Sequence, residues 1–376
     1  MDRYQALARQ IVEYSLAVKE NELVWIESWD GETELTQALV CSVTEHGAVP
    51  QVSRMDHAIQ RALLMGLRRE GADKLGQLAL DEMKHVDSFV SIRPLEGRFD
   101  EREIPPQQNV IYALGMSPAR RQRMFHTKWC VLRAPDEGAG ARCGMEQAEF
   151  ERYSWQSLLV DYEKMTELAQ PLAEDMKHVD EVRIVSPGTD IRFSIRGCKE
   201  KPAFINDTGI GRLNLPDGEI GGGVVRESAE GEISYNIPTS YNGLYFGKIH
   251  FVFHQGKIIR ASCDQPDRQE ALDAILDTDD GARYLGEFSL GIHPLITRPI
   301  GDKLYDEKMW GSFHLTPGNG NSAVHWDIVQ CQREEFGGGE MYWDGKLIRR
   351  NGLFIPTEYR PLNPPELIAA ITQKEN

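Results

Sequence analysis

The fold of this chain is first visible in a short apolar run, Glu22-Leu-Val-Trp-Ile-Glu-Ser28, which contains β-branched and aromatic residues. Such a run is typical of a buried strand. A helical segment follows from Glu32 to Glu45. Two further strand-like runs, Val49-Pro-Gln-Val-Ser53 and Val86-Asp-Ser-Phe-Val-Ser-Ile92, are separated by a long helical stretch. Because strands that alternate with helices pair in parallel, we predict an N-terminal α/β domain with a parallel sheet covered by helices.

The sequence changes in character near residue 180. Gln147 to Lys177 is predicted to be helical, and strands with glycine-rich turns follow it. The runs Val182-Arg-Ile-Val185 and Asp190-Ile-Arg-Phe-Ser-Ile-Arg196 flank Ser-Pro-Gly-Thr and predict a strand–turn–strand unit. A chain of 376 residues is longer than a single core usually grows. We therefore expect an N-terminal α/β domain over residues 1–180 and a C-terminal α+β domain over residues 181–376.

Composition narrows the possible partners. The hydrophobic content of 41% and the charged content of 27% are ordinary for a soluble globular protein. A formal net charge of −16 argues against a nucleic-acid partner, because no excess of Lys and Arg is available to neutralise phosphates. No apolar run approaches the roughly 18 residues that a membrane span needs, so no membrane partner is expected. Six scattered cysteines without a Cys-Xaa-Xaa-Cys pair indicate reduced thiols in a cytoplasm: Cys41, Cys130, Cys143, Cys198, Cys263 and Cys331.

Residues that can carry chemistry gather in the 22 residues that end at Asp327. Glu307 lies near the start of this stretch, and His314 and His325 flank a glycine-rich segment that can pass close to a ligand. If Val324-His325-Trp326-Asp327 is a strand, its imidazole and carboxylate point to one face and its apolar side chains to the other. Such nitrogen and oxygen ligands suit zinc, cobalt, manganese or iron. A surface loop with an incidental His-Xaa-Asp is the alternative.

Two carboxylates further upstream favour the metal site. Glu219 follows the turn Pro-Asp-Gly and precedes three glycines, although a solvated glutamate in a surface turn has the same pattern. Glu287 lies in the apolar run Tyr284-Leu-Gly-Glu-Phe-Ser-Leu-Gly, where a carboxylate is costly to bury unless a cation or strong hydrogen bonds meet it. Four carboxylates and two imidazoles are more than one structural zinc needs. They match a two-metal hydrolytic site, in which carboxylates bridge ions roughly 3.5–4 Å apart.

These motifs together resemble the thermophilic metallopeptidases of the aminopeptidase T type. The resemblance rests on five ordered segments: Asn214-Leu-Pro-Asp-Gly-Glu219, Leu285-Gly-Glu287, Asp306-Glu-Lys308, Gly311-Ser-Phe-His314 and Asn321-Ser-Ala-Val-His-Trp-Asp327. Their order and spacing fit over about 115 residues. The length and the two-part layout fit over the whole chain.

The resemblance implies an enzyme that uses two divalent ions, such as zinc, cobalt, manganese or magnesium, to hydrolyse the N-terminal peptide bond of peptides with a free N-terminus through a metal-bridged water. It also implies a homodimer. Glu307 would be either a further ligand or the general base. The five ligands implied are Glu219, Glu287, His314, His325 and Asp327.

Other readings of the same residues stay open. A mononuclear Fe(II) ring-cleaving dioxygenase of the dihydroxypyridine type needs only two histidines and one carboxylate, which His314, His325 and Asp327 could provide. A relative that binds small molecules or peptides without catalysis is a third possibility. The chain also departs from the family pattern, because Asn321 stands where some members carry a tyrosine and because His293 is not part of the pattern.

Overall fold

A computed structural model describes residues 2–95, 104–197, 212–241 and 243–372. The backbone divides into two compact units, Met1–Leu159 with Ile205–Pro216 and Val160–Phe204 with Asp217–Asn376. The predicted domain boundary at residue 180 stays a prediction. None of the helices in the described ranges combines the length and the apolar character that a membrane crossing requires.

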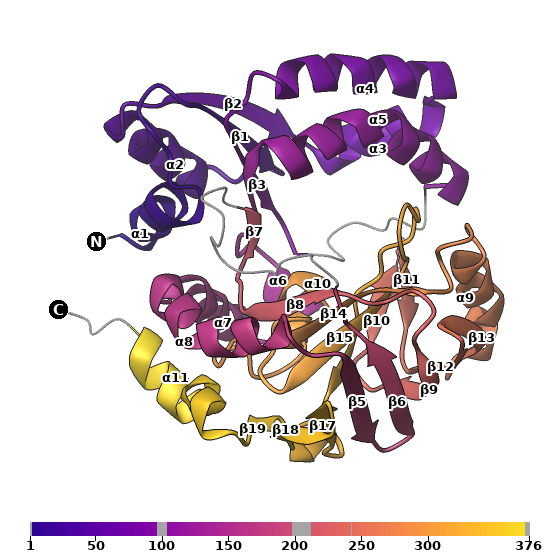
Figure 1. Ribbon diagram of the computed structural model, residues 1–376. Helices are drawn as coiled ribbons and strands as arrows, with labels where there is room; N and C mark the ends of the chain where they lie inside the picture. Colours follow the sequence, from indigo (N-terminus) through magenta and orange to yellow (C-terminus); the bar gives the residue numbers. More distant parts are fainter. Residues whose placement is uncertain (1, 96–103, 198–211, 242, 373–376) are drawn as a thin grey trace. The chain divides into compact units, whose positions relative to one another are not determined.

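The first unit is built on a parallel sheet of five strands in the order β2-β1-β3-β4-β7. In Figure 1, helices α1 and α2 lie on one side of this sheet and α3, α4 and α5 on the other. That arrangement follows from right-handed crossovers, because the chain moves one way from β1 to β2 and the opposite way from β2 to β3. The strands are β1 Leu23–Trp29, β2 Val49–Met55, β3 Ser88–Arg93, β4 Lys128–Arg133 and β7 Arg212–Leu215.

Helices precede, separate and follow these strands along the chain of the first unit. They are α1 Arg3–Arg9, which continues as the π-helical turn η1 Gln10–Ser15, α2 Glu34–Glu45, α3 His57–Gly66, α4 Arg69–Met83, α5 Pro106–His126, α6 Ala139–Arg142 and α7 Gln147–Leu158. The predicted α/β domain with a parallel sheet is thereby confirmed.

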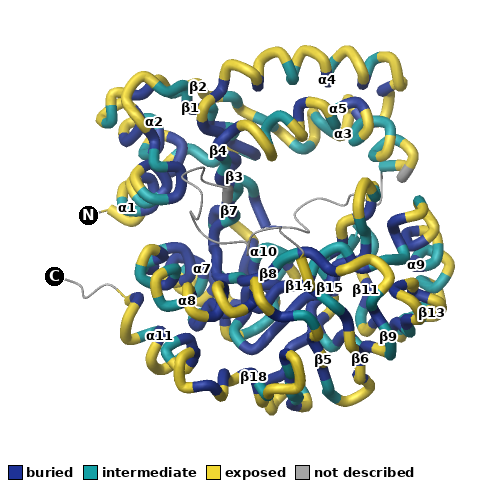
Figure 2. The backbone as a smooth tube through the Cα atoms, viewed as in Figure 1, coloured by how far each residue is buried: buried dark blue, intermediate teal, exposed yellow. Residues whose placement is uncertain are grey.

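The second unit contains antiparallel sheets. An eight-stranded sheet has the order β13-β12-β9-β6-β5-β17-β18-β19, a four-stranded sheet the order β16-β15-β14-β8, and β10 pairs with β11. The two larger sheets pack against each other through aromatic rings, for instance Phe193 of β6 against Phe288 of β14, with ring centroids 5.1 Å apart. Figure 2 shows that β14 and β15 lie in the buried interior. The mixture of antiparallel strands and helices confirms the predicted α+β class.

The strands of the second unit are β5 Glu181–Ser186, β6 Thr189–Ser194, β8 Glu219–Gly223, β9 Glu230–Tyr235, β10 Thr239–Tyr241, β11 Leu244–Phe246, β12 Ile249–His254, β13 Lys257–Cys263, β14 Leu285–Gly291, β15 Ser312–Pro317, β16 Ile328–Cys331, β17 Glu340–Trp343, β18 Lys346–Arg350 and β19 Leu353–Phe354. Its helices and helical turns are α8 Tyr162–Met176, η3 Pro266–Arg268, α9 Gln269–Leu276, α10 Lys303–Asp306, η4 Glu334–Phe336, η5 Thr357–Leu362 and α11 Pro364–Ile371.

The helical region predicted over residues 147–177 consists of two helices, α7 and α8. The break lies at Leu159, whose backbone leaves the helical conformation, with φ −105° and ψ 63°. Asp161 then starts α8 as an N-cap, and its side chain accepts a hydrogen bond from the backbone N–H of Lys164 at 2.8 Å.

Candidate metal centre

One face of the four-stranded sheet presents three of the predicted site residues. In the antiparallel register, Glu219 of β8 lies opposite Gly291 of β14, and Glu287 of β14 lies opposite Thr316 of β15. His314 precedes Thr316 by two residues on β15 and therefore points to the same face. The opposite face is apolar and buried, with Ile220, Phe288, Leu290, Phe313 and Leu315. Strand alternation thus brings Glu219, Glu287 and His314 together.

The His-Xaa-Asp segment is not a strand, because β16 begins only at Ile328. The predicted alternation nevertheless holds: Val324 and Trp326 are buried, whereas the side chain of His325 is 61% exposed. His325 Nε2 lies 3.3 Å from Asp327 Oδ1. The imidazole and the carboxylate therefore lie on one side of the segment, as predicted, although the segment is not the predicted strand.

Glu287 lies between the two histidines. Its Oε1 is 3.5 Å from His314 Nε2, and its Oε2 is 3.6 Å from His325 Nε2. The hydroxyl of Ser289 also donates to Oε1 at 3.1 Å. Each carboxylate oxygen therefore faces a different imidazole.

Glu307 comes from the loop after α10, which is fixed from both sides. The preceding Asp306 accepts hydrogen bonds from the backbone N–H groups of Ile300 at 2.7 Å and Gly301 at 3.0 Å. On the other side, a Cβ on Gly291 would lie 2.8 Å from the carbonyl oxygen of Glu307. The loop therefore lies directly on the end of β14, and only a glycine there permits this close approach.

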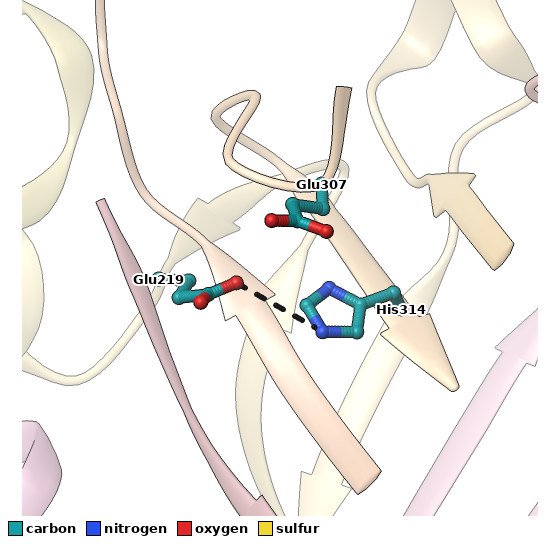
Figure 3. A group of neighbouring side chains, drawn as sticks. All are labelled: Glu219, Glu307 and His314. Carbon is teal, nitrogen blue, oxygen red and sulfur yellow. Dashed lines mark ion pairs between the residues drawn. The ribbon is translucent and has the colours of Figure 1, made fainter. Parts of the chain in front are cut away.

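Two groups of side chains in the described ranges bring potential ligand atoms within 4.8 Å of one another. One consists of Glu219, Glu307 and His314, the other of Glu287, His314 and Asp327. Figure 3 shows the first group, and its dashed line marks the ion pair between Glu219 and His314. Glu219 Oε2 lies 3.9 Å from His314 Nε2. Within the described residues, Glu219 Oε2 is buried and has no hydrogen-bond partner. The Lys308 ammonium group lies 3.5 Å from this oxygen without donating a hydrogen bond to it, so the oxygen can still ligate a divalent cation.

The electrostatics of the site also favour cations. Burial alone would lower the pKa of His314, but the carboxylates of Glu287, Asp327 and Glu219 outweigh it and raise this pKa to about 10. The carboxylate of Asp327 likewise raises the pKa of His325. Burial would raise the pKa of Asp327, yet the two imidazoles lower it. The field that stabilises positive imidazoles would also stabilise divalent ions.

The sequence did not assign a role to Lys308, which lies in the same site. This lysine is fully buried, its Nζ donates to Glu307 Oε1, and it lies 3.5 Å from Glu219 Oε2. Burial would lower its pKa, but the nearby carboxylates raise it, so the group is an ammonium. Burial raises the pKa of Glu307 to about 8 even beside this charge. The sequence did not indicate that Lys308 is buried, because a lysine that follows two acidic residues is typical of an exposed surface.

His293, which departs from the family pattern, packs beside the same loop. It is completely buried, and its Nδ1 accepts a hydrogen bond from the backbone N–H of Leu295 at 3.2 Å. Its backbone N–H donates to the carbonyl oxygen of Lys308 at 2.9 Å.

We expect Gly221→Ala to destabilise the sheet that carries the site. A Cβ on Gly221 would lie 1.7 Å from Ser289 Oγ and 2.3 Å from the carbonyl oxygen of Phe288. Overpacking of this kind costs about 1–3 kcal/mol, which a lower urea midpoint of unfolding would report. Gly66→Ala is the matched control, because its Cβ meets no heavy atom within 4 Å. Equal midpoints for the two variants would contradict the prediction.

The sequence model of a family described as thermophilic metalloprotease (M29) matches residues 1–338. The chain belongs to this family. The family that the sequence motifs predicted, a family of metal-dependent peptidases, is thereby confirmed. Aminopeptidase 2 from Geobacillus stearothermophilus is 34% identical over 80 residues, which are 21% of this chain and 19% of that protein. The match therefore spans about a fifth of this curated relative.

Two solved structures share the fold over nearly the whole chain. Wild-type AmpT from Thermus thermophilus has a TM-score of 0.75 at 19% identity, with 94% of this chain and 99% of that chain covered. The 2,5-dihydroxypyridine dioxygenase from Pseudomonas putida KT2440 has a TM-score of 0.59 at 15% identity, with 96% and 100% covered. At these identities the likeness concerns the fold alone.

Proposed function

We propose that this chain is an aminopeptidase that uses two divalent ions, held by Glu219, Glu287, His314, His325 and Asp327. The observation that carries the proposal is the position of Glu287, whose two oxygens face His314 and His325 separately. On each side of this carboxylate a further acid is available, Glu219 at His314 and Asp327 at His325. A bridging carboxylate with one histidine and one acid on each side suits two ions better than one.

The charge of the site also supports two ions. Glu219, Glu287, Glu307 and Asp327 are four carboxylates, and within the described part of the site Lys308 provides one ammonium group against them. When all four carboxylates are ionised and both imidazoles are neutral, as metal ligation requires, the remaining negative charge exceeds what one divalent ion neutralises. Burying uncompensated charge is costly, so a second ion would stabilise the site.

Glu307 is the residue we propose for the proton transfers. Divalent ions, when bound, would polarise the scissile carbonyl and lower the pKa of a water molecule. Glu307 would take one proton from the attacking water as its oxygen bonds to the carbonyl carbon. It would return that proton to the amine nitrogen as the C–N bond breaks. Burial raises the pKa of Glu307 to about 8 in the site without ions, and bound ions would lower it toward neutral pH, where the group could both accept and donate a proton.

The proposed substrates are peptides with a free N-terminus, because a bound ion or a neighbouring carboxylate would hold the α-amino group and so restrict cleavage to the first residue. We further propose zinc, cobalt, manganese or magnesium as the ions, a homodimer, and a cytoplasmic location. The last of these rests on the scattered cysteines.

The proposal is tested by measuring the metal content of the purified protein and its hydrolysis of a panel of aminoacyl-p-nitroanilides. Near two ions per chain and metal-dependent release of p-nitroaniline are expected. One iron per chain without hydrolysis would overturn the proposal and favour the dioxygenase, for which His314, His325 and Asp327 suffice. In that reading Glu219 and Glu287 have no role.

A further inference from the structure

Lys308 is an unusual residue for the interior of a metal site. Lysine is almost never fully buried unless it is paired with an acid. The Lys308 side chain is 0% exposed, and two carboxylates pair with it. Its ammonium group donates to one oxygen of Glu307 and lies 3.5 Å from Glu219 Oε2. It is thus a fixed internal cation beside the acid to which the proposed function gives the proton transfers.

The backbone leaves this lysine little freedom. The N–H of Lys308 donates to the carbonyl oxygen of Tyr305 at 3.0 Å, and its own carbonyl accepts from His293 at 2.9 Å. The same loop rests on Gly291, where a Cβ would lie 2.8 Å from the carbonyl oxygen of Glu307. Glu307 and Lys308 are therefore held as a unit above the sheet, with their side chains in contact.

We propose that Lys308 is a positioning residue that keeps Glu307 out of the set of metal ligands. An ammonium group hydrogen-bonded to one oxygen of Glu307 withdraws that oxygen from a metal ion. Glu219 Oε2 lies 3.5 Å from the same nitrogen but accepts no hydrogen bond from it, so this oxygen stays available as a ligand. The second oxygen of Glu307 remains available to exchange a proton with water. Lys308 thereby decides between the two roles that the sequence left open for Glu307.

This inference rests on the proposed function and is tested first without activity, with Co²⁺ as the probe. With Lys308 in place, the single substitution Glu307→Gln should leave the visible absorption spectrum of bound Co²⁺ unchanged, because Glu307 is not a ligand. In Lys308→Met, Glu307 should become a ligand, so the spectrum should change. Adding Glu307→Gln to Lys308→Met should then reverse that change.

Catalysis gives the second readout. Lys308→Met should lower kcat by about 10²-fold, at the low end of what a positioned acid or base contributes, with KM changed less than about threefold. The double variant Lys308→Met/Glu307→Gln should be no slower than Glu307→Gln alone, since both changes remove the same function. Lys346→Met, which removes an exposed lysine, is the matched control and should change neither readout.

The outcomes separate the inference from the proposed function. A natural protein that binds one Co²⁺ or hydrolyses no substrate contradicts the proposed function. Two bound ions and hydrolysis, together with an unchanged spectrum and kcat in Lys308→Met, overturn only the role of Lys308. A Co²⁺ spectrum that changes on Glu307→Gln alone also overturns it. If Lys308→Met does not fold, Lys308→Leu, which also removes the donor and the charge, replaces it in the same comparisons.

Discussion

Glu287→Ala should abolish hydrolysis and reduce the metal content of the protein below two ions per chain. Glu287 is the carboxylate whose oxygens lie 3.5 Å from His314 Nε2 and 3.6 Å from His325 Nε2. Without it, each half of the proposed site loses one ligand and the two halves lose their bridge. Because metal ions supply several kcal/mol of transition-state stabilisation, kcat/KM should fall by about 10³-fold or more.

The measurement is hydrolysis of aminoacyl-p-nitroanilides at saturating metal, together with metal analysis after gel filtration. Glu270→Ala, at an exposed position of α9, is the matched control and should keep both the activity and the ions. If the Glu287→Ala protein retains two ions and normal hydrolysis, Glu287 is not a metal ligand and the prediction is wrong. The circular dichroism spectrum of the variant should match that of the natural protein, since the Glu287 side chain is partly exposed and its removal leaves no closed cavity in the core.

The parallel sheet of the first unit follows from local sequence patterns, because strands that alternate with helices predict it. A carboxylate in an apolar strand likewise marks Glu287 as a candidate site residue. That Glu219, Glu287 and His314 share one face could not be predicted, because it depends on the pairing of β8, β14 and β15. The sequence also predicted that His325 and Asp327 share a side. The sequence could not show that these two residues precede strand β16 instead of lying in a strand, because side chains alternate in the same way in a strand and in an extended segment.

The role of the loop after α10 could not be predicted in the same way. Lys308 follows Asp306 and Glu307, and three charged residues in succession are typical of a solvated surface. Their burial depends on Gly291, a residue about fifteen positions earlier, which permits the loop to lie on the end of β14. This contact between the loop and β14 arises from tertiary packing, so it cannot be predicted from the sequence of either segment alone.

Glu307→Gln should lower kcat by about 10²–10⁴-fold, the usual contribution of a positioned general acid or base. Glutamine has the shape of glutamate but cannot take the proton of the attacking water or return it to the leaving amine. The number of bound ions should not change, because the five proposed ligands remain. A change in KM of less than about threefold is expected, since the effect falls on the chemical step.

The comparison that decides the role of Glu307 is between loss of metal and loss of rate. Metal analysis of Glu307→Gln that shows one ion per chain would make Glu307 a ligand and contradict its role as the proton acceptor. Glu270→Gln is the control for the chemistry of the substitution, because that residue is exposed on α9.

In the protein without ions, burial raises the pKa of Glu307 to about 8, so its carboxyl group holds a proton below that pH and releases it above. Nearby divalent ions favour the carboxylate, so they should extend the range over which Glu307 accepts a proton toward lower pH.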